Sequence, residues 1–338
     1  MDQDIFKKAF ANKSCLVTGG TGLIGRAVAK ALRKWGALVR VASLDDIKLC
    51  EDIEAIRGDL TDFSFCKQCV QGMDFVFHVA GIKGSIEVTK SKPASFFVPL
   101  LQMNTNLLEA ARREGVDKLV YTSSIGAYST AEVFIEPEDP LADFDSSPMD
   151  SFPGWAKRMA EMQIAAYNIQ YGMNNYTIVR PCNVYGPGDN FDPENAMVIP
   201  SLMARIANGE RPLTVWGDGS AIRDFAYSED VAYGIAQALL LGAGKGIFNL
   251  GSGIGYTIRE LVETLASIAK IDFQFDTSKP SGYPRRIMDI SKASQELGYT
   301  PKTTLAEGLK STWEWYLENP GESAKRKNYF TENEHGED

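Results

Sequence analysis

Histidine and cysteine are scarce in this sequence, and their placement limits the chemistry that the chain can carry. The 338 residues include only two histidines, His78 and His335, and five cysteines scattered along the chain. Histidines so far apart argue against a histidine-based metal site, and we expect no metal. An odd number of dispersed cysteines argues against a disulfide framework and indicates reduced thiols. We interpret Cys66 and Cys69, which have no second pair nearby, as packed helix residues.

The sequence also lacks long apolar runs and a surplus of positive charge. No apolar run approaches the ~20 residues that span a bilayer, and residues 1–8 lack the apolar core of a signal peptide. We therefore expect a cytoplasmic protein with no membrane partner. The 44 acidic residues outnumber the 35 lysines and arginines, giving a net charge of −9. This balance argues against a nucleic-acid partner, because surplus basic residues bind phosphate backbones, but a few arginines could still hold a small anion.

What the sequence does contain is a glycine-rich turn near its start. Residues 16–17 have the pattern of a buried strand, and Gly19, Gly22 and Gly25 follow with the spacing G-x-x-G-x-x-G. Apolar residues then recur at helical spacing over 23–35, which predicts a helix. A strand, a glycine turn and a helix together indicate a dinucleotide site. The helix N-terminus attracts a pyrophosphate, which can approach closely only where side chains are missing.

Strands and helices alternate along the next part of the chain. The predicted strands and their exits lie at 38–43, 75–81, 118–122 and 176–179, and the longest predicted helices lie at about 94–114 and 154–171. This alternation predicts a Rossmann-type, doubly wound parallel sheet of the α/β class. Beyond residue 180 the regularity falls, which predicts a smaller C-terminal α/β lobe. We therefore predict a dinucleotide-binding domain over 1–180 and a mainly substrate-binding lobe over 181–338, from which one strand and one helix could return to the first domain.

The end of the second strand bears on the choice between NAD and NADP. Ser43 occupies the place where an NAD site usually has an acidic residue for the ribose hydroxyls, and Asp45 and Asp46 follow just beyond. These acidic neighbours favour NAD. Arg40 and Lys48 lie close enough in sequence to leave NADP open.

The exits of the third and fourth strands hold further candidates for the cofactor site. Asp59 can meet the adenine amine or cap the following helix, and Val79 and Ala80 are small where a cofactor backbone would pass. His78 fits a packed strand-end histidine as well as it fits a ligand contact.

Several motifs together resemble the extended short-chain dehydrogenases/reductases, in the branch that modifies nucleotide sugars. The motifs are Thr18–Gly25, Gly58–Leu60, Tyr121–Ser124, Arg180–Pro187, Arg223–Phe225 and Asp289–Ala293. The segment from Tyr185 to Pro200 looks especially like GDP-fucose synthases. The resemblance implies an NAD-dependent oxidoreductase acting on a nucleotide sugar, with a GDP-linked hexose oxidised or reduced at C4 as the leading substrate.

The resemblance also implies roles for particular residues. Ser124 matches a catalytic serine that hydrogen-bonds the reacting hydroxyl or ketone, and Lys157 matches the lysine of a Tyr-x-x-x-Lys pair, which bonds the nicotinamide ribose. Asn183, Arg223 and either Arg285 or Arg286 match groups that bind the substrate diphosphate. The expected cofactor-binding residues are Gly19, Gly22, Leu23, Ile24, Gly25, Ser43, Asp59, Leu60, Val79, Ala80, Lys157 and Pro181.

The sequence departs from the family at the tyrosine, whose place four residues before Lys157 holds Pro153. Proline has no ionisable group, although it fits the first turn of a helix. GDP-fucose synthases also use a cysteine and a histidine for epimerisation, where this chain has Ile125-Gly126 and Met197. We therefore expect no double epimerisation. Water relayed through Ser124, Tyr128, or a carboxylate such as Asp143 or Asp145 could supply the missing acid or base.

Two other functions remain open from the sequence. One is a nucleotide-sugar 4-epimerase, which needs proton exchange on both faces of the sugar. The other is a protein that binds cofactor and nucleotide sugar but has lost catalysis, and Pro153 is its best support. We also expect a homodimer, which the family forms through helices corresponding here to about 94–114 and 154–171, whose apolar residues fit a core equally well.

Overall fold

A seven-stranded parallel sheet forms the centre of the molecule. The computed structural model describes residues 3–82, 84, 86–134, 144, 151–192, 195–322 and 325. The strands run in the order β11 (Ile247–Leu250), β7 (Tyr176–Pro181), β5 (Lys118–Thr122), β4 (Phe75–His78), β1 (Ser14–Thr18), β2 (Leu38–Ser43) and β3 (Glu54–Arg57). Every neighbouring pair is parallel. The predicted Rossmann-type α/β fold is therefore confirmed, and the strand order reverses beside β1, where such sheets bind ligands.

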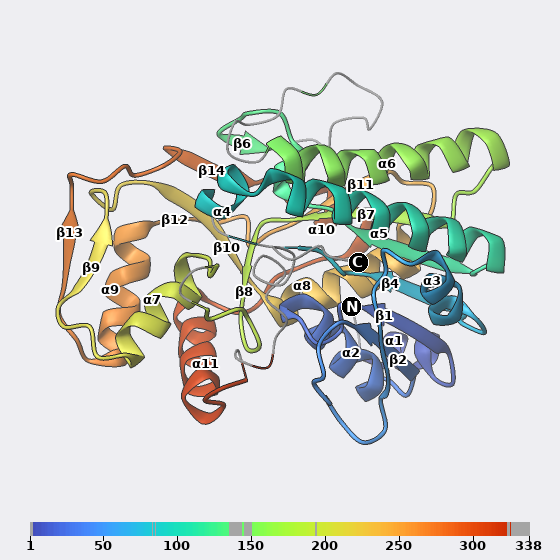
Figure 1. Ribbon diagram of the computed structural model, residues 1–338, viewed down its shortest axis with the longest axis horizontal. Helices are drawn as coiled ribbons and strands as arrows, with labels where there is room; N and C mark the ends of the chain where they lie inside the picture. The colour runs from blue at the N-terminus through green and yellow to red at the C-terminus, as the bar shows by residue number, and fades with distance from the viewer. Residues whose placement is uncertain are drawn as a thin grey trace, which may run out of the picture.

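Helices cover both faces of this sheet (Figure 1). The helices against one face are α1 (Gln3–Phe10), α2 (Leu23–Lys34), α8 (Ser228–Leu241) and α10 (Ser291–Leu297), and those against the other are α3 (Phe63–Val70), α5 (Pro93–Glu114) and α6 (Ser151–Tyr171). Successive residues of a strand point to opposite faces. Val17 accordingly packs into the core with α2 and α8, while Leu16 packs into the core with α5 and α6.

A second group of strands and helices lies at one side of the sheet, on the left of Figure 1. It contains a mixed sheet of β12 (Gly255–Thr257), β10 (Ile222–Tyr227), β14 (Arg285–Met288) and β6 (Val133–Phe134), with β8 (Asn183–Tyr185) paired to β10. A two-stranded sheet of β9 (Leu213–Trp216) and β13 (Phe273–Asp276) and the helices α7 (Val198–Ala207), α9 (Ile258–Ala269) and α11 (Leu305–Glu318) complete it. The shorter elements are α4 (Ile86–Ser91) and the 3₁₀ turn η1 (Ile125–Ala127).

The division at residue 180 stays a prediction. Both β11 and α8 come from beyond that residue, yet β11 extends the central sheet and α8 packs against α2. A strand and a helix from beyond residue 180 thus belong to the central sheet and to the helices that cover it. Within the described part of the chain, no helix is both long and apolar enough to cross a bilayer.

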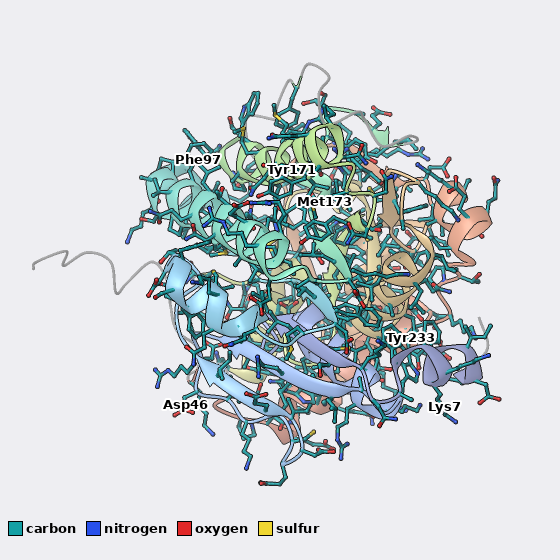
Figure 2. All side chains as sticks on the ribbon, turned by 90° about the vertical axis from the view of Figure 1, so that its right-hand side faces the viewer. Lys7, Asp46, Phe97, Tyr171, Met173 and Tyr233 are labelled. Atoms are coloured by element: carbon teal, nitrogen blue, oxygen red, sulfur yellow. The ribbon has the colours of Figure 1, made fainter. Side chains whose placement is uncertain are left out.

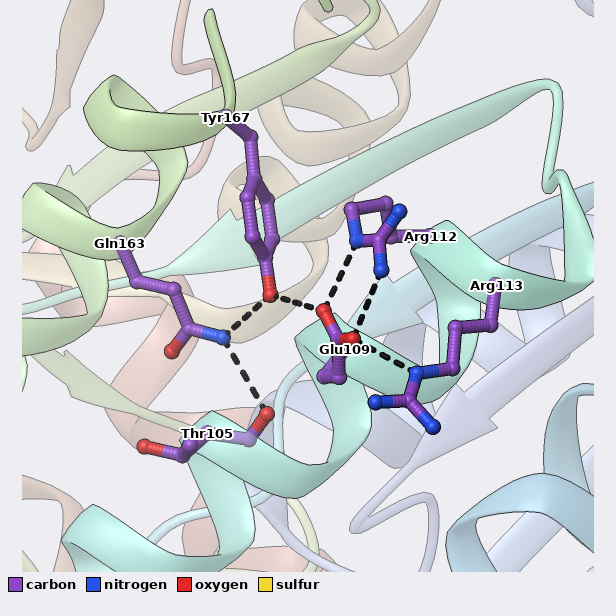
Figure 3. A network of polar contacts seen from close by, with 6 residues as sticks. All are labelled: Thr105, Glu109, Arg112, Arg113, Gln163 and Tyr167. Atoms are coloured by element: carbon purple, nitrogen blue, oxygen red, sulfur yellow. Dashed lines mark hydrogen bonds and ion pairs between the residues drawn. The ribbon is translucent and has the colours of Figure 1, made fainter. Parts of the chain in front are cut away.

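A polar network fastens α5 to α6 (Figure 3). The carboxylate of Glu109 accepts hydrogen bonds from Arg112 at 2.7 and 2.8 Å, from Arg113 at 2.6 Å and from the Tyr167 hydroxyl at 2.7 Å. The Gln163 amide donates to that same hydroxyl at 2.7 Å and to the Thr105 carbonyl at 3.2 Å. The guanidinium of Arg112 above all lowers the pKa of Glu109, to about 2. The network holds α6, and therefore Lys157 on it, in register with α5.

Cys66 and Cys69 lie on α3 and their side chains pack into the core, as predicted. Both are buried, and the Cys66 thiol donates to the Leu60 carbonyl at 3.2 Å. Burial raises the pKa of Cys69 to about 12 and that of Cys66 further. Thiols held protonated in this way are inert packing groups.

Candidate active site

The turn between β1 and α2 is shaped for a close approach of two backbones. Gly19 has a φ of +63°, and a side chain on it would meet the Ala80 backbone at 2.8 Å. A Cβ on Gly25 would lie 2.2 Å from the Gly19 carbonyl oxygen. Gly22, which has no side chain, precedes the first turn of α2, and that turn contains no acidic residue. The first N–H groups of a helix have no partner within the helix, and this helix start lines a cavity that an anion can enter.

A cavity of about 620 Å³ extends from this turn to the C-terminal group of elements. Its volume lies within the usual range for small-molecule sites. The structure brings the following predicted residues together along its wall: Gly19, Gly22, Leu23, Ile24, Gly25, Ser43, Asp59, Leu60, Val79, Ala80, Ser124, Lys157, Pro181, Asn183, Arg223 and Arg286. Residues from both halves of the chain thus line one continuous space.

Of the two alternatives Arg285 and Arg286, the structure places only Arg286 in the described lining. Arg285 is exposed and lies outside the described lining, whereas Arg286 lines the cavity. The reason is the alternation of side chains along β14. In the pairing of β14 with β10, Arg286 stands opposite Arg223, and Arg285 stands opposite Ile222.

The end of the cavity beside β2 is acidic. The Thr21 hydroxyl lies 2.6 Å from the Ser43 hydroxyl and donates to the Asp45 carboxylate at 2.8 Å. Arg40, one of the two residues that left NADP open, instead bonds Glu54 and the backbone carbonyls of Cys69 and Gln71.

Lys48, the second of these residues, pairs with Glu51 at 2.5 Å. Asp59 accepts a bond from the Thr61 N–H at 2.8 Å, and Asp62, rather than Asp59, caps α3. Asp59 therefore lines the cavity without serving as that helix cap.

His78 belongs to the core. The Thr18 hydroxyl accepts from the Val79 and Ala80 N–H groups, so its own proton points to His78 Nδ1 at 2.9 Å. His78 Nε2 then donates to the side-chain oxygen Oδ1 of Asn104 at 3.0 Å. Burial lowers the pKa of His78 to about 3. The histidine is thus a neutral link between β1 and α5, and not a ligand contact.

Ser124 and Lys157 both line the cavity, as does Pro153, one turn before the lysine. The Ser124 hydroxyl accepts from the Gly126 N–H at 3.0 Å and begins η1. Lys157 Nζ donates to the Thr122 carbonyl at 2.8 Å and lies 5.1 Å from the centre of the Tyr121 ring. Burial lowers the pKa of Lys157 to about 8, and the charge of Glu161 opposes this shift.

A buried ion pair, which sequence reasoning missed, lies behind Ser124 and Lys157. Glu161 accepts from Arg180 at 2.6 and 2.9 Å and from the Ser123 hydroxyl at 2.5 Å, and the side chains of the ion pair are fully buried. Glu161 lies one helical turn after Lys157, and this spacing was the available signal. Its partner is 19 residues further along the chain, which local spacing does not reveal.

The structure bears on one of the substitutes considered for the tyrosine, Tyr128. Tyr128 is buried outside the described lining, donates to the Asn249 side chain and stacks 4.3 Å from the Arg180 guanidinium. Burial raises the pKa of Tyr128 to about 12. It therefore does not exchange protons with the cavity. Asp143 and Asp145 lie outside the described residues.

Two arginines and an asparagine form the far end of the cavity. Asn183 donates to the Asp224 carbonyl at 3.0 Å, and Arg223 donates to the Ile222 carbonyl at 2.8 Å. Burial and the neighbouring charge of Arg286 lower the pKa of Arg223. Sequence reasoning missed the polar residues Thr21, Asp189, Asn190, Asp192, Asn195 and Tyr283 in the lining.

Known proteins that resemble this chain identify its family. The family model described as "NAD dependent epimerase/dehydratase family" matches residues 15–251. The chain belongs to this family. GDP-L-fucose synthase 1 of Arabidopsis thaliana is 34% identical over 310 residues, covering 90% of this chain and 93% of that protein. GDP-L-fucose synthase of Escherichia coli K12 is 30% identical over 318 residues, covering 90% and 96%.

Solved structures of the family share the fold. An epimerase from Methanothermobacter thermautotrophicus superposes with a TM-score of 0.83 at 27% identity, covering 94% of this chain and 95% of that one. The resemblance inferred from the motifs is therefore confirmed at the level of the family, its fold and its NAD-dependent chemistry.

Proposed function

We propose that this protein is an NAD-dependent oxidoreductase that acts on a nucleotide sugar, with C4 of a GDP-linked hexose as its leading target. One observation carries the proposal. A single cavity joins the glycine turn of β1 and α2, the Ser124–Lys157 pair, and the facing arginines Arg223 and Arg286. This order of groups suits a dinucleotide at one end, a diphosphate at the other and a reacting carbon between them. The relatives named GDP-L-fucose synthase support the choice of a GDP-sugar.

The glycine turn fits the cofactor. Side chains at Gly19 and Gly25 would occupy space already filled by backbone, and the residues that open α2 line the cavity. Bound there, a nicotinamide dinucleotide accepts or supplies a hydride. The Asp45 carboxylate, held by Thr21, favours ribose hydroxyls over a 2′-phosphate. We accordingly propose NAD as the cofactor.

Arg223 and Arg286 fit the diphosphate of the substrate. Two guanidinium groups side by side repel one another, and this repulsion contributes to the lowered pKa of Arg223. A diphosphate relieves the repulsion and offers oxygens to both planar donors. Asn183, on the strand next to Arg223, adds an amide at the same end.

The reaction we propose is narrower than that of the fucose synthases that the motifs resemble. The positions where that resemblance expects a cysteine and a histidine hold Ile125-Gly126 and Met197. None of these side chains exchanges protons, so we propose no double epimerisation. Ser124 positions the reacting oxygen of the sugar.

Two other functions are kept as alternatives. A 4-epimerase is favoured by the likeness to a solved epimerase, and it would change the stereochemistry without net formation of NADH. A protein that binds without turnover is favoured by Pro153 in the wall of the cavity. Ligand binding in the absence of any turnover would support this second alternative.

Binding and turnover with a nucleotide-sugar panel test the proposal. We expect calorimetry to detect NAD and at least one GDP-hexose, and NADH absorbance at 340 nm to report oxidation. Arg286→Gln should weaken nucleotide-sugar binding by at least about tenfold, since charge-assisted bonds contribute about 1.5–3 kcal/mol each. Arg285→Gln is the matched control on the same strand, and its side chain is exposed. Equal losses in both variants, or no binding by the native protein, would refute the assignment.

We also propose a homodimer and a cytoplasmic location. Apolar side chains are exposed along α5 and α6, among them Val98 at 47%, Phe152 at 45% and Met159 at 44%. Figure 2 shows Phe97 and Tyr171 on this pair of helices, away from the corner where Lys7 and Tyr233 lie. Analytical ultracentrifugation of the native protein should give twice the monomer mass. The Met159→Glu variant should give the mass of a single monomer.

A further inference from the structure

We propose that Lys157 itself exchanges the proton of the reacting sugar hydroxyl, in place of the missing tyrosine. The inference rests on the proposed function and deepens it. Pro153, one turn earlier on α6, offers no proton, and Pro153, Ser124 and Lys157 all line the same cavity. The glycine turn and the two arginines line this cavity too, so a sugar bound with a dinucleotide and its own diphosphate would share the cavity with Lys157.

The contacts of Lys157 leave its amine able to act. Its Nζ donates to the Thr122 carbonyl at 2.8 Å, which uses one of the three donors of an ammonium. Gly81 lies close to the amine, because a Cβ built on it would be 3.5 Å from Nζ. Since glycine has no side chain, none covers the amine from this residue. The Thr122 carbonyl orients the amine of Lys157, which α6 holds in place. A carbonyl carries no net charge, so this bond does not neutralise the ammonium.

The groups around Lys157 determine how far its pKa is shifted. Glu161 on α6 is the nearest acidic group that affects it, but Glu161 is already paired with Arg180 on β7. Tyr121 on β5 presents its ring, and its hydroxyl accepts from Asn104. His78 on β4 is neutral and buried. With no carboxylate bonded to Nζ among the described residues, burial dominates and lowers the pKa of Lys157 to about 8.

The proton transfer balances in both directions. In oxidation, neutral Nζ takes the hydroxyl proton onto its lone pair and becomes an ammonium. The O–H electron pair becomes the second bond of the new carbonyl, and a hydride leaves the same carbon for NAD⁺, the oxidant of the proposal. In reduction, the ammonium returns the proton to the oxygen as the hydride arrives. A group with a pKa near the working pH suits both directions.

Two substitutions separate proton exchange from positioning. Lys157→Met removes the amine and should lower kcat by ~10²–10⁴-fold. Lys157→Arg keeps a positive charge and hydrogen-bond donors but stays protonated at every working pH. We expect Lys157→Arg to lose nearly as much kcat while it still binds NAD by calorimetry. A Lys157→Arg protein that keeps kcat within about threefold, with an unchanged pH profile, would overturn the proposal.

A measurement on the native protein covers the case in which the variants do not fold. Competitive acetylation with acetic anhydride, read by mass spectrometry, reports the pH at which each amine becomes nucleophilic. We expect a midpoint near pH 8 for Lys157, with exposed Lys30 as internal reference, and protection by the nucleotide sugar. A midpoint above pH 10 would overturn the proposal. Failure of the proposed function appears differently, as a native protein that neither binds nor converts any nucleotide sugar.

Discussion

Replacing Glu161 by glutamine tests how the buried side of the candidate site is held together. The Glu161 carboxylate receives both bonds of the Arg180 guanidinium and the Ser123 hydroxyl, and the ion pair is fully buried. Glutamine keeps the shape but leaves the guanidinium with no counter-charge in a medium of low polarity. Breaking one partner of such a pair costs about 3–5 kcal/mol. We expect urea unfolding at pH 7 to show a loss of this size for Glu161→Gln.

The double variant Glu161→Met/Arg180→Met is the matched control. It removes both charges and fills the space with apolar side chains, so we expect it to cost less than Glu161→Gln alone. Two results would refute the reasoning. One is a loss of unfolding free energy below about 1 kcal/mol for Glu161→Gln. The other is a double variant that loses as much as Glu161→Met and Arg180→Met added together. The same substitution bears on catalysis, because the charge of Glu161 raises the pKa of Lys157. Glu161→Gln should therefore move the inflection of the oxidation rate to lower pH.

Three further outcomes follow from the contacts described. Gly25→Ala should weaken NAD binding by at least about tenfold in calorimetry, since its Cβ would lie 2.2 Å from the Gly19 oxygen; unchanged binding would exclude the glycine turn. Asp45→Ala should raise the NADP-to-NAD preference, measured as the ratio of kcat/KM, because the carboxylate near Ser43 repels a 2′-phosphate. Glu109→Gln should destabilise the protein at pH 7 by about 1–3 kcal/mol. Because folding lowers the pKa of Glu109 from 4.5 to about 2, this stabilisation is present above pH 4.5 and disappears as the pH falls toward 2, so thermal melts of the two proteins should converge there.

The sequence sufficed for the parts of the site that depend on neighbours along the chain. The glycine turn combines a strand end, a spacing and a helix start within about ten residues, and each part constrains the next. Ser124 and Lys157 could be located because the motifs around them are local. The prediction for this end of the cavity therefore depended little on knowing how distant segments pack.

Residues whose role depends on distant partners were beyond such reasoning. Because side chains alternate along a strand, Arg285 and Arg286 lie on opposite faces of β14. Which of them faces the cavity is set by the pairing of β14 with β10, some 60 residues away. Tyr128 follows Ser124 closely, and only the fold shows that Asn249 and Arg180 enclose it. These two placements have one cause, since tertiary pairing decides which side of an element faces the cavity.

Pro153 shows how chemistry can change at this site without a change in the scaffold. It lies in the first turn of α6, where a missing N–H costs little. At the next residue, Gly154, a Cβ would lie 2.3 Å from the Gly126 carbonyl, so backbone contact fixes α6 against the turn that follows Ser124. That contact does not depend on the side chain at position 153. Relative to the tyrosine that the resemblance expects at this position, the proline lacks a phenol, while the Gly154 contact holds α6 beside the turn after Ser124. The proposed reaction therefore depends on whether the amine of Lys157 exchanges the proton.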